Sequence, residues 1–181
     1  MKRIAVIGCG FAGLATAWHL LNKNPNLEIT LFDKKGIGSG ASGIATGLLH
    51  PFMGRKANLS WRGLEGISST IELLRISEEA LGKSPILSKG LLRPCYYDEQ
   101  KDYFQQTADS SQCSWFSTEK IKDQLPDFAP SLGGLWIPEG FTISCSSYLQ
   151  GLWKACEALG ATLNIKETPN LTALKEYCHV V

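Results

Sequence analysis

The chain has 181 residues, of which 44% are hydrophobic and 19% are charged, with 18 Lys and Arg residues against 17 Asp and Glu residues. This composition excludes a disordered or collagen-like chain, because it supplies enough apolar side chains for a core. The formal net charge of +1 gives no electrostatic reason to expect a nucleic acid or a membrane surface as a partner. No stretch of the sequence approaches the roughly 18 consecutive apolar residues of a membrane span.

The spacing of the cysteines argues against a metal site. No two of the six cysteines are separated by only two residues, so neither a zinc ribbon nor a dithiol redox motif is present in the sequence. We therefore expect no bound metal and a reduced, cytoplasmic protein. Eleven of the 18 glycines lie between Gly8 and Gly66, so close contacts between backbone and ligand are expected there first.

The first 33 residues predict a strand, a glycine-rich turn, a helix and a second strand. Residues 4–7 form a short apolar run that suits a strand buried on both faces. Apolar residues recur at helical spacing from Phe11 to Leu21, and residues 27–32 are typical of a second strand. This second strand ends at Asp33, which follows the last glycine of the turn by twenty residues.

The turn at residues 8–13 has the spacing of a dinucleotide-binding turn. Gly8 permits the tight turn, Gly10 lets the backbone approach a pyrophosphate, and Gly13 allows the helix to pack closely on the strand. The pyrophosphate would rest against the N-terminus of the helix, where free N–H groups and the helix dipole favour an anion. The sequence therefore predicts a bound dinucleotide.

The acid at the end of the second strand bears on which dinucleotide is bound. Asp33 would accept hydrogen bonds from the adenosine ribose. Lys34 and Lys35 could bind a 2′-phosphate, which would indicate NADP, although the Asp33 carboxylate would repel that phosphate. Alternatively, both lysines are solvated side chains at a strand end.

Residues 36–51 are first rich in glycine and serine, and then become apolar while still containing glycine. Such a segment is either a flexible surface loop or a backbone that lies against a flat ring. At this point the sequence resembles the D-amino-acid-oxidase-like (DAO) family of FAD-dependent oxidoreductases. In that family a Gly-Ala-Ser-Gly loop and a glycine-apolar-proline segment follow the dinucleotide fold, and the corresponding residues are 40–43 and 47–51.

The resemblance implies FAD as the cofactor. It implies that residues 41–42 approach the pyrophosphate and that residues 47–49 run beside the isoalloxazine. Ile44 stands where some relatives carry a histidine that attaches the flavin, so noncovalent FAD is expected. The expected cofactor-binding residues are Gly8, Gly10, Phe11, Ala12, Gly13, Asp33, Lys34, Ala41, Ser42, Gly47, Leu48 and Leu49.

The resemblance also implies an α/β fold, with a three-layer, Rossmann-like FAD-binding domain interrupted by part of a β-rich substrate domain. We expect the FAD-binding domain at residues 1–85 and 145–181, and the partial substrate domain at residues 86–144. Members of the family continue beyond this length. The chain is therefore expected to be a fragment, a shortened gene product or a relative that has lost catalysis.

The middle of the chain predicts further elements. An amphipathic helix is expected around residues 64–74, and a strand over residues 86–93. Residues 106–113 suggest a polar, solvated loop, and residues 133–140 resemble a pair of strands. A helical stripe over residues 149–159 predicts a helix with Ser146 or Ser147 as its N-cap, followed by a strand.

The activity implied by the resemblance is FAD-dependent oxidation of a secondary amine or an amino-acid-like C–N bond to an imine. Within the family, the sequence around residues 40–51 is most similar to that of the oxidase modules of tRNA 5-methylaminomethyl-2-thiouridine biosynthesis proteins. The substrate would then be a small-molecule amine or a modified tRNA nucleoside. An NAD(P)-dependent oxidoreductase would use the same turn but leaves residues 40–51 unexplained, and a nucleotide-binding scaffold without catalysis is the alternative from another class.

The sequence assigns no catalytic residue. His50 is the titratable side chain beside the expected ring position, although a histidine before a proline is often structural. Arg55, Lys56 and Arg62 form a local basic cluster, which would either bind a substrate carboxylate or an RNA phosphate, or form a solvated face.

Overall fold

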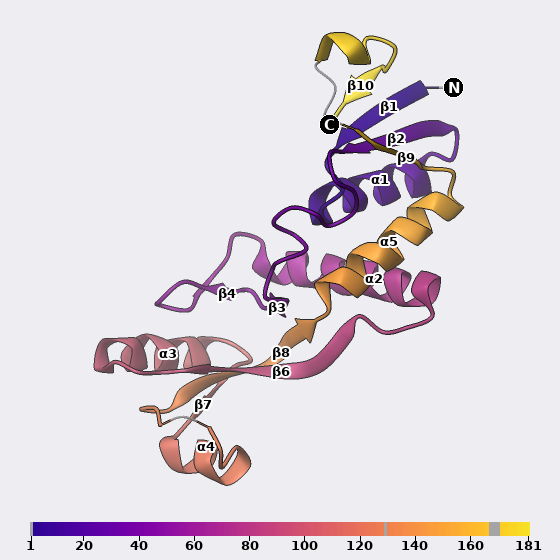
Figure 1. Cartoon of the computed structure of the whole chain (residues 1–181). Coiled ribbons are helices and arrows are strands. Elements are labelled where there is room, and N and C mark those ends of the chain that lie inside the picture. Colours follow the sequence, from indigo (N-terminus) through magenta and orange to yellow (C-terminus); the bar gives the residue numbers. More distant parts are fainter. Residues whose placement is uncertain (1, 129, 167–170) are drawn as a thin grey trace. The chain divides into compact units, whose positions relative to one another are not determined.

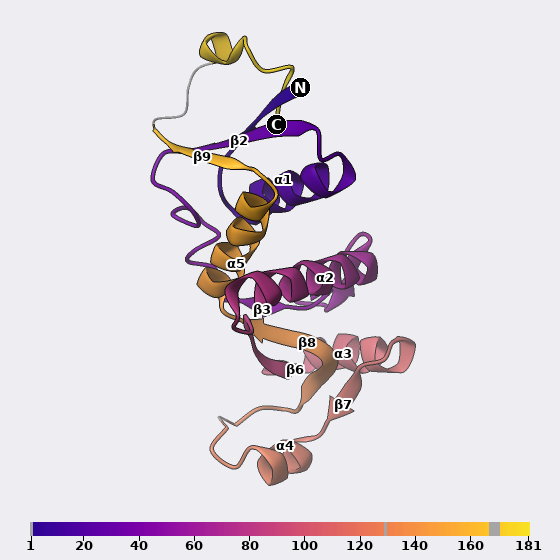
Figure 2. The same cartoon turned by 90° about the vertical axis from the view of Figure 1, so that its right-hand side faces the viewer.

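The computed structural model describes residues 2–128, 130–166 and 171–181. The chain divides into two compact units, whose elements are labelled in Figures 1 and 2. Unit 1 comprises Met1–Thr46, Thr70–Pro85 and Ser144–Val181, and unit 2 comprises Gly47–Ser69 and Ile86–Ile143. No helix among the described residues is long and apolar enough to cross a membrane.

Unit 1 is built on a parallel four-stranded sheet. Its strands follow the order β10-β1-β2-β9, and each neighbouring pair is parallel. The inner strand residues are buried because both faces of a parallel sheet are covered. The strands are β1 (Lys2–Ile7), β2 (Leu27–Asp33), β9 (Thr162–Ile165) and β10 (His179–Val180). The expected α/β fold with a parallel sheet is confirmed.

Two helices of unit 1 pack against each other beside this sheet. The helix α1 (Phe11–Lys23) buries side chains three and four residues apart, which gives it one apolar face. The helix α5 (Cys145–Ala158) meets α1 where the rings of Phe11 and Tyr148 stack with centroids 5.3 Å apart. This contact lies at the N-terminus of α1, so it helps to position the glycine turn.

The N-cap of α5 differs from the expectation. Ser144 is the cap, and its Oγ accepts a hydrogen bond from the N–H of Ser147. The expected caps, Ser146 and Ser147, lie inside the helix, because its buried face already begins at Cys145. Gly160 follows the end of the helix with a φ of +93°, a conformation that favours glycine.

The helix α2 (Gly63–Leu81) continues from unit 2 into unit 1, and its second half contacts α5. The amphipathic helix is confirmed and is longer than expected, with buried positions at Leu73, Leu74 and Ser77. The Ser77 hydroxyl is fully buried and donates to the Tyr148 carbonyl at 2.9 Å. A Cβ on Gly151 would lie 2.2 Å from the Ser77 Oγ and 2.3 Å from the Ser77 carbonyl oxygen.

We therefore expect Gly151→Ala to lower the free energy of unfolding by about 1–3 kcal/mol, the cost of overpacking a close contact. Chemical denaturation followed by circular dichroism measures this change. Gly66→Ala is the control, because a Cβ on Gly66 meets nothing within 4 Å and alanine favours a helix. Equal stability of the two variants would contradict the close crossing of α2 and α5.

Unit 2 contains an antiparallel sheet in the order β3-β8-β6, with β7 also paired to β8. Two short strands, β4 and β5, form a separate hairpin. The remaining helices of the unit are α3 and α4. The bounds are β3 (Leu48–Leu49), β4 (Phe52–Met53), β5 (Asn58–Leu59), β6 (Ile86–Pro94), α3 (Asp98–Ser110), β7 (Ser114–Phe116), α4 (Thr118–Gln124) and β8 (Gly134–Ile143).

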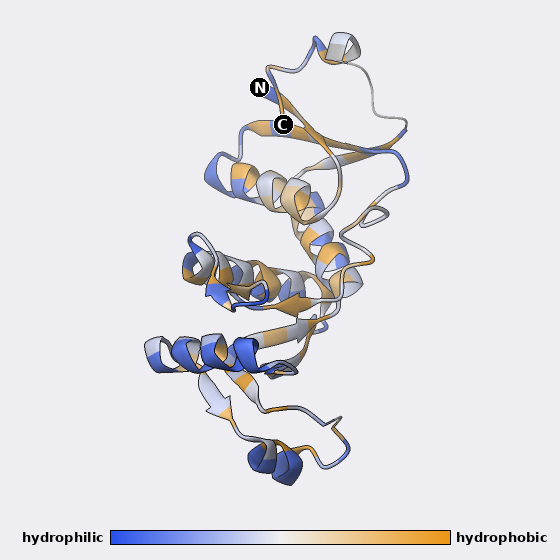
Figure 3. Ribbon diagram, turned by 90° about the vertical axis from the view of Figure 1, so that its left-hand side faces the viewer, coloured by the Kyte–Doolittle hydropathy of each residue, from blue (hydrophilic) through white to orange (hydrophobic). Residues whose placement is uncertain are grey.

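Two expectations about unit 2 are wrong. The expected strand pair at residues 133–140 is one continuous strand, β8, because Gly140 serves a close approach rather than a turn: a Cβ there would lie 2.7 Å from Leu91 Cβ. The expected loop at residues 106–113 is largely the end of α3, which Figure 3 shows as mostly hydrophilic. Its apolar signal is weak because Phe104 is its one buried residue.

The units differ from the expected domains at residues 47–69 and, by a single residue, at Ser144, which groups with unit 1. Residues 47–69 were expected in the FAD-binding domain, but they group with unit 2. The reason is that β3 pairs with β8, while Phe52 and Ala57 belong to the core around Phe104. Which unit binds FAD and which binds substrate stays a prediction.

Candidate cofactor-binding site

The turn between β1 and α1 requires glycine at two positions. Gly8 has a φ of +101°, a backbone conformation that L side chains rarely adopt. Its N–H donates to the Phe32 carbonyl at 2.7 Å, which ties the turn to β2. A Cβ on Gly13 would lie 2.0 Å from the Gly8 carbonyl oxygen, so a side chain there would force the helix away from the turn. Both glycines therefore have the structural reasons that the sequence predicted.

The N-terminus of α1 is in contact with Ser42. The Phe11 N–H donates to the Ser42 Oγ at 3.2 Å, across 31 residues of sequence. A Cβ on Gly10 would lie 2.5 Å from the same Oγ. Because a hydroxyl that accepts one hydrogen bond can still donate its own, Ser42 can offer a proton to an anion at this helix end. Gly10, Phe11 and Ser42 are thus brought together as expected for a pyrophosphate site.

Asp33 is at the centre of a hydrogen-bond network. Its Oδ2 accepts the N–H of Cys9 at 2.9 Å. Its Oδ1 accepts the N–H groups of Lys35 and Gly36, both at 2.9 Å, and the hydroxyl of Ser39 at 3.1 Å. Oδ2 receives a single bond from the described residues, so it can accept a second donor such as a ribose hydroxyl. Asp33 therefore organises the protein backbone, a role that its expected contact with ribose did not include.

The protonation state of Asp33 follows from this network. Burial acts to raise the pKa of the carboxyl, whereas the hydrogen bonds from Cys9, Lys35, Gly36 and Ser39 act to lower it. The hydrogen bonds prevail, because they stabilise the charged form, and the pKa of Asp33 lies below its ordinary value. Asp33 is therefore ionised at neutral pH.

The loop over residues 36–43 is folded onto the turn, and sequence reasoning missed part of it. The Gly38 N–H donates to the Cys9 carbonyl at 3.0 Å. A Cβ on Gly43 would lie 1.9 Å from the Gly38 carbonyl oxygen, so the loop closes tightly on itself. Ser39, Gly38 and Gly43 therefore belong to the site. Their signal in the sequence was the alternation of glycine with small residues, which indicated a loop but not its partners.

The predicted site residues fall into both units. Unit 1 contains most of the set, and Lys34 and Ala41 are exposed in it. The remaining three residues, at positions 47–49, belong to unit 2, where the Gly47 carbonyl accepts the Ile143 N–H at 2.8 Å. Leu48 is 55% exposed there although it is apolar. The residues in unit 1 are Gly8, Gly10, Phe11, Ala12, Gly13, Asp33, Lys34, Ala41 and Ser42, and those in unit 2 are Gly47, Leu48 and Leu49.

Residues 3–168 match the model of the family described as "FAD dependent oxidoreductase" (DAO). The chain belongs to this family. The dinucleotide of the DAO family is FAD, which decides against NADP and against an NAD(P)-dependent oxidoreductase.

Solved structures of amino-acid and amine oxidoreductases share the fold of this DAO-family chain. Glycine oxidase from Geobacillus kaustophilus has a TM-score of 0.75 and 22% identity, covering 91% of this chain and 47% of that one. Iminodiacetate oxidase from Chelativorans sp. BNC1 has a TM-score of 0.67 and 16% identity, covering 90% and 46%. L-proline dehydrogenase from P. horikoshii has a TM-score of 0.64 and 22% identity, covering 90% and 43%. The chain thus spans less than half the length of these proteins.

The geometry of unit 1 fits the FAD of the DAO family. Gly10 has no side chain to block the approach of a pyrophosphate, and the α1 N-terminus and the Ser42 hydroxyl supply hydrogen-bond donors. Asp33 is a charged acceptor at the end of β2, where a ribose is expected. Within the described residues, no group of three or more His, Cys, Asp or Glu side chains could hold a metal ion.

His50 follows the segment at residues 47–49. Its Nδ1 is buried and has no hydrogen-bond partner among the described residues. Burial lowers the pKa of His50, the positive charge of Arg93 lowers it further, and a hydrogen bond with the Phe52 backbone acts the other way. The imidazole is therefore neutral at pH 7, and it can accept or donate a hydrogen bond but supplies no positive charge.

Proposed function

We propose that the whole protein to which this chain corresponds is an FAD-dependent oxidoreductase that oxidises the C–N bond of an amino acid or a secondary amine to an imine. The observation that carries the proposal is the site of unit 1, where the glycine turn, Ser42 and the ionised Asp33 form a cradle for a dinucleotide. Membership of the DAO family makes that dinucleotide FAD.

The substrate class rests on the names of structurally similar proteins. Glycine, iminodiacetate and L-proline each carry an amino nitrogen next to a carbon that bears a carboxylate, and the last two are secondary amines. FAD, when bound, accepts a hydride from such a carbon. The residues of this chain would hold the cofactor: the α1 N-terminus and Ser42 at the pyrophosphate, Asp33 at the ribose, and residues 47–49 beside the ring.

The finer hypothesis places the amine on a modified tRNA nucleoside. It is supported by the amino-acid sequence of residues 36–51, which is similar to that of the oxidase modules of tRNA-modifying proteins. The two hypotheses share the cofactor and differ in the size of the substrate. One experiment can therefore test both.

Anaerobic mixing of the FAD-loaded, full-length protein with a panel of amines is that experiment. The panel contains glycine, N-methylglycine, L-proline, iminodiacetate and unfractionated modified tRNA. We expect saturable loss of the visible absorption of the oxidised flavin with at least one small amine. Reduction of the flavin by modified tRNA, but by none of the small amines, would support the nucleoside hypothesis instead. No reduction by any member of the panel, in a protein that retains FAD, would contradict amine oxidation.

A further inference from the structure

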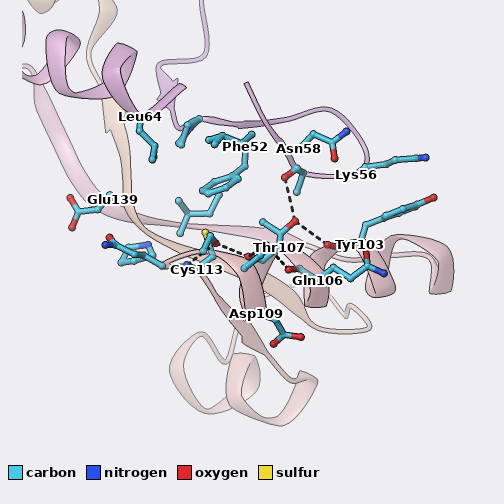
Figure 4. Close-up of a pocket in the computed structure, with 18 of the residues that line it drawn as sticks. Phe52, Lys56, Asn58, Leu64, Tyr103, Gln106, Thr107, Asp109, Cys113 and Glu139 are labelled. Atoms are coloured by element: carbon cyan, nitrogen blue, oxygen red, sulfur yellow. Dashed lines mark hydrogen bonds between the residues drawn. The ribbon is translucent and has the colours of Figure 1, made fainter. Parts of the chain in front are cut away.

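Unit 2 contains a cavity that shares no residue with the predicted FAD contacts. Its volume is about 880 Å³, within the roughly 300–1,000 Å³ typical of small-molecule sites. All of its lining residues belong to unit 2, in the segment at residues 51–67, in α3 and the turn after it, and in β8. Figure 4 shows Phe52 and Leu64 on one side of it and Thr107 and Cys113 on the other.

One wall of the cavity is held in place by the protein itself. Ala57 lines it with a φ of +52° although it is not glycine, a conformation that persists only where the surroundings impose it. Arg93 imposes part of it, because its guanidinium donates to the carbonyls of Phe52 and Gly54 at 2.8 and 2.7 Å. The Thr107 hydroxyl also lies 3.4 Å from the Ala57 carbonyl. The hairpin of β4 and β5 is thus fixed, and the cavity is preformed.

The hydroxyl groups of the α3 wall are already paired with the protein. Thr107 Oγ1 donates to the Tyr103 carbonyl at 3.0 Å, and Ser110 Oγ to the Gln106 carbonyl at 2.7 Å. Ser111 Oγ donates to the Thr107 carbonyl at 2.6 Å. A ligand that makes no hydrogen bonds there leaves none of these groups unsatisfied, so an apolar body fits this wall better than a sugar does.

The opposite side is apolar and partly open to water. Leu59 is 53% exposed and Leu64 is 61% exposed, and both line the cavity beside Phe52 and Ile67. Covering these side chains with an apolar ligand removes apolar surface from water, which is favourable. A rigid ring system covers such a surface with little loss of conformational freedom, so it suits a preformed cavity better than a flexible chain does.

The positive charge of the lining does not face the cavity. Lys56 is exposed, its amino group is hydrogen-bonded to Tyr103, and the carboxylate of Glu99 attracts it. Figure 4 shows the Lys56 side chain extended away from the space between Phe52 and Thr107. An anionic ligand in that space would therefore gain no cation as its partner.

Two carboxylates also line the cavity, and both are exposed to water. Glu139 is paired with Lys89 Nζ at 3.0 Å. Asp109 points away from the space between Phe52 and Thr107 in Figure 4. Neither carboxylate therefore offers an enclosed partner to a cationic ligand, and their negative charges oppose an anionic one. A charge of either sign that entered the space would lose hydration without gaining a partner, which is unfavourable.

We propose that this cavity binds an uncharged small molecule built on a rigid, apolar ring system. The other polar side chains of the lining are uncharged amides and hydroxyls, which tolerate a neutral polar substituent on the ring. The site is additional to the FAD cradle and does not rest on the proposed amine oxidation.

Three probes of the same shape test the proposal on this 181-residue chain. They are 2-naphthamide, which is neutral, 2-naphthoate, which is an anion, and 2-naphthamidine, which is a cation. Each is titrated into protein with ¹³C-labelled isoleucine methyl groups. We expect 2-naphthamide to shift the Ile67 and Ile137 signals saturably and to leave the Ile29 signal of unit 1 in place, because only the first two residues line the cavity. Both charged probes should bind at least about fivefold more weakly, because their lost hydration is not replaced.

A pair of leucine variants locates the binding. Leu64→Glu should weaken binding of 2-naphthamide by about fivefold, because it replaces apolar lining with a charge. Leu87→Glu is the matched control and should leave the affinity unchanged, because Leu87 is a similarly exposed leucine of unit 2 that does not line the cavity.

Three results would overturn the proposal. The first is the absence of saturable shifts at Ile67 and Ile137. The second is binding of either charged probe as tightly as the amide, because the ring substituent would then not enter an apolar space. The third is an equal loss of affinity in the two leucine variants, which would place the ligand outside this cavity.

Discussion

Gly10→Val is expected to weaken FAD binding by about 30-fold or more, which corresponds to ~2 kcal/mol within the range for overpacking a close contact. The first side-chain atom would lie 2.5 Å from the Ser42 Oγ, so valine would displace this hydroxyl from the helix end where the pyrophosphate is expected. The fold should survive, because Gly10 has φ −89° and ψ −170°, a conformation that valine adopts readily. Titration of the apoprotein with FAD, followed by flavin fluorescence, measures the change.

Gly40→Val is the matched control for this experiment. A Cβ on Gly40 meets nothing within 4 Å, although the residue belongs to the same loop as Ser42. The control should therefore retain FAD at close to the wild-type level. A folded Gly10→Val variant with wild-type affinity would show that the pyrophosphate does not approach this turn.

Asp33→Ala is expected to lower both the stability of the apoprotein and its affinity for FAD. Each hydrogen bond to a charged group contributes about 1.5–3 kcal/mol, and Asp33 accepts bonds from Cys9, Lys35, Gly36 and Ser39. We expect the free energy of unfolding to fall by at least about 1.5 kcal/mol. Asp33→Asn should lower the stability of the apoprotein nearly as much. The NH₂ group of asparagine is a donor, so it would face one of the N–H or O–H donors that the carboxylate now accepts.

Urea denaturation of the apoprotein separates the two roles of Asp33. A loss of FAD affinity with unchanged apoprotein stability would mean that the carboxylate serves ribose alone. Asp102→Ala, at an exposed carboxylate of α3, controls for the loss of a negative charge.

The loss of stability caused by Asp33→Asn should depend on pH. The pKa of Asp33 is lowered in the folded state, so its contribution to stability is present above the unfolded pKa of about 3.9 and is lost as the pH falls through the folded pKa. The difference in unfolding free energy between wild type and Asp33→Asn should therefore be constant near neutral pH and shrink below about pH 4. A difference that stayed constant down to pH 2 would contradict the network.

The sequence by itself determined the glycine turn, the acid that follows it and the family. These features are local, because the spacing of Gly8, Gly10 and Gly13 is a requirement of one strand, one turn and one helix. The apolar runs also predicted β1, β2 and α5 at close to their observed bounds.

Only the tertiary structure decided which groups these residues meet. Ser42 contacts the α1 N-terminus across 31 residues of sequence, and the Ser39 hydroxyl donates a hydrogen bond to Asp33. Both contacts depend on how the loop folds back, which no local sequence pattern indicates. The same holds for α3, where a single buried residue, Phe104, leaves too little periodicity to predict a helix. The cavity of unit 2 was therefore invisible in the sequence, since its walls come from segments joined only by long-range packing.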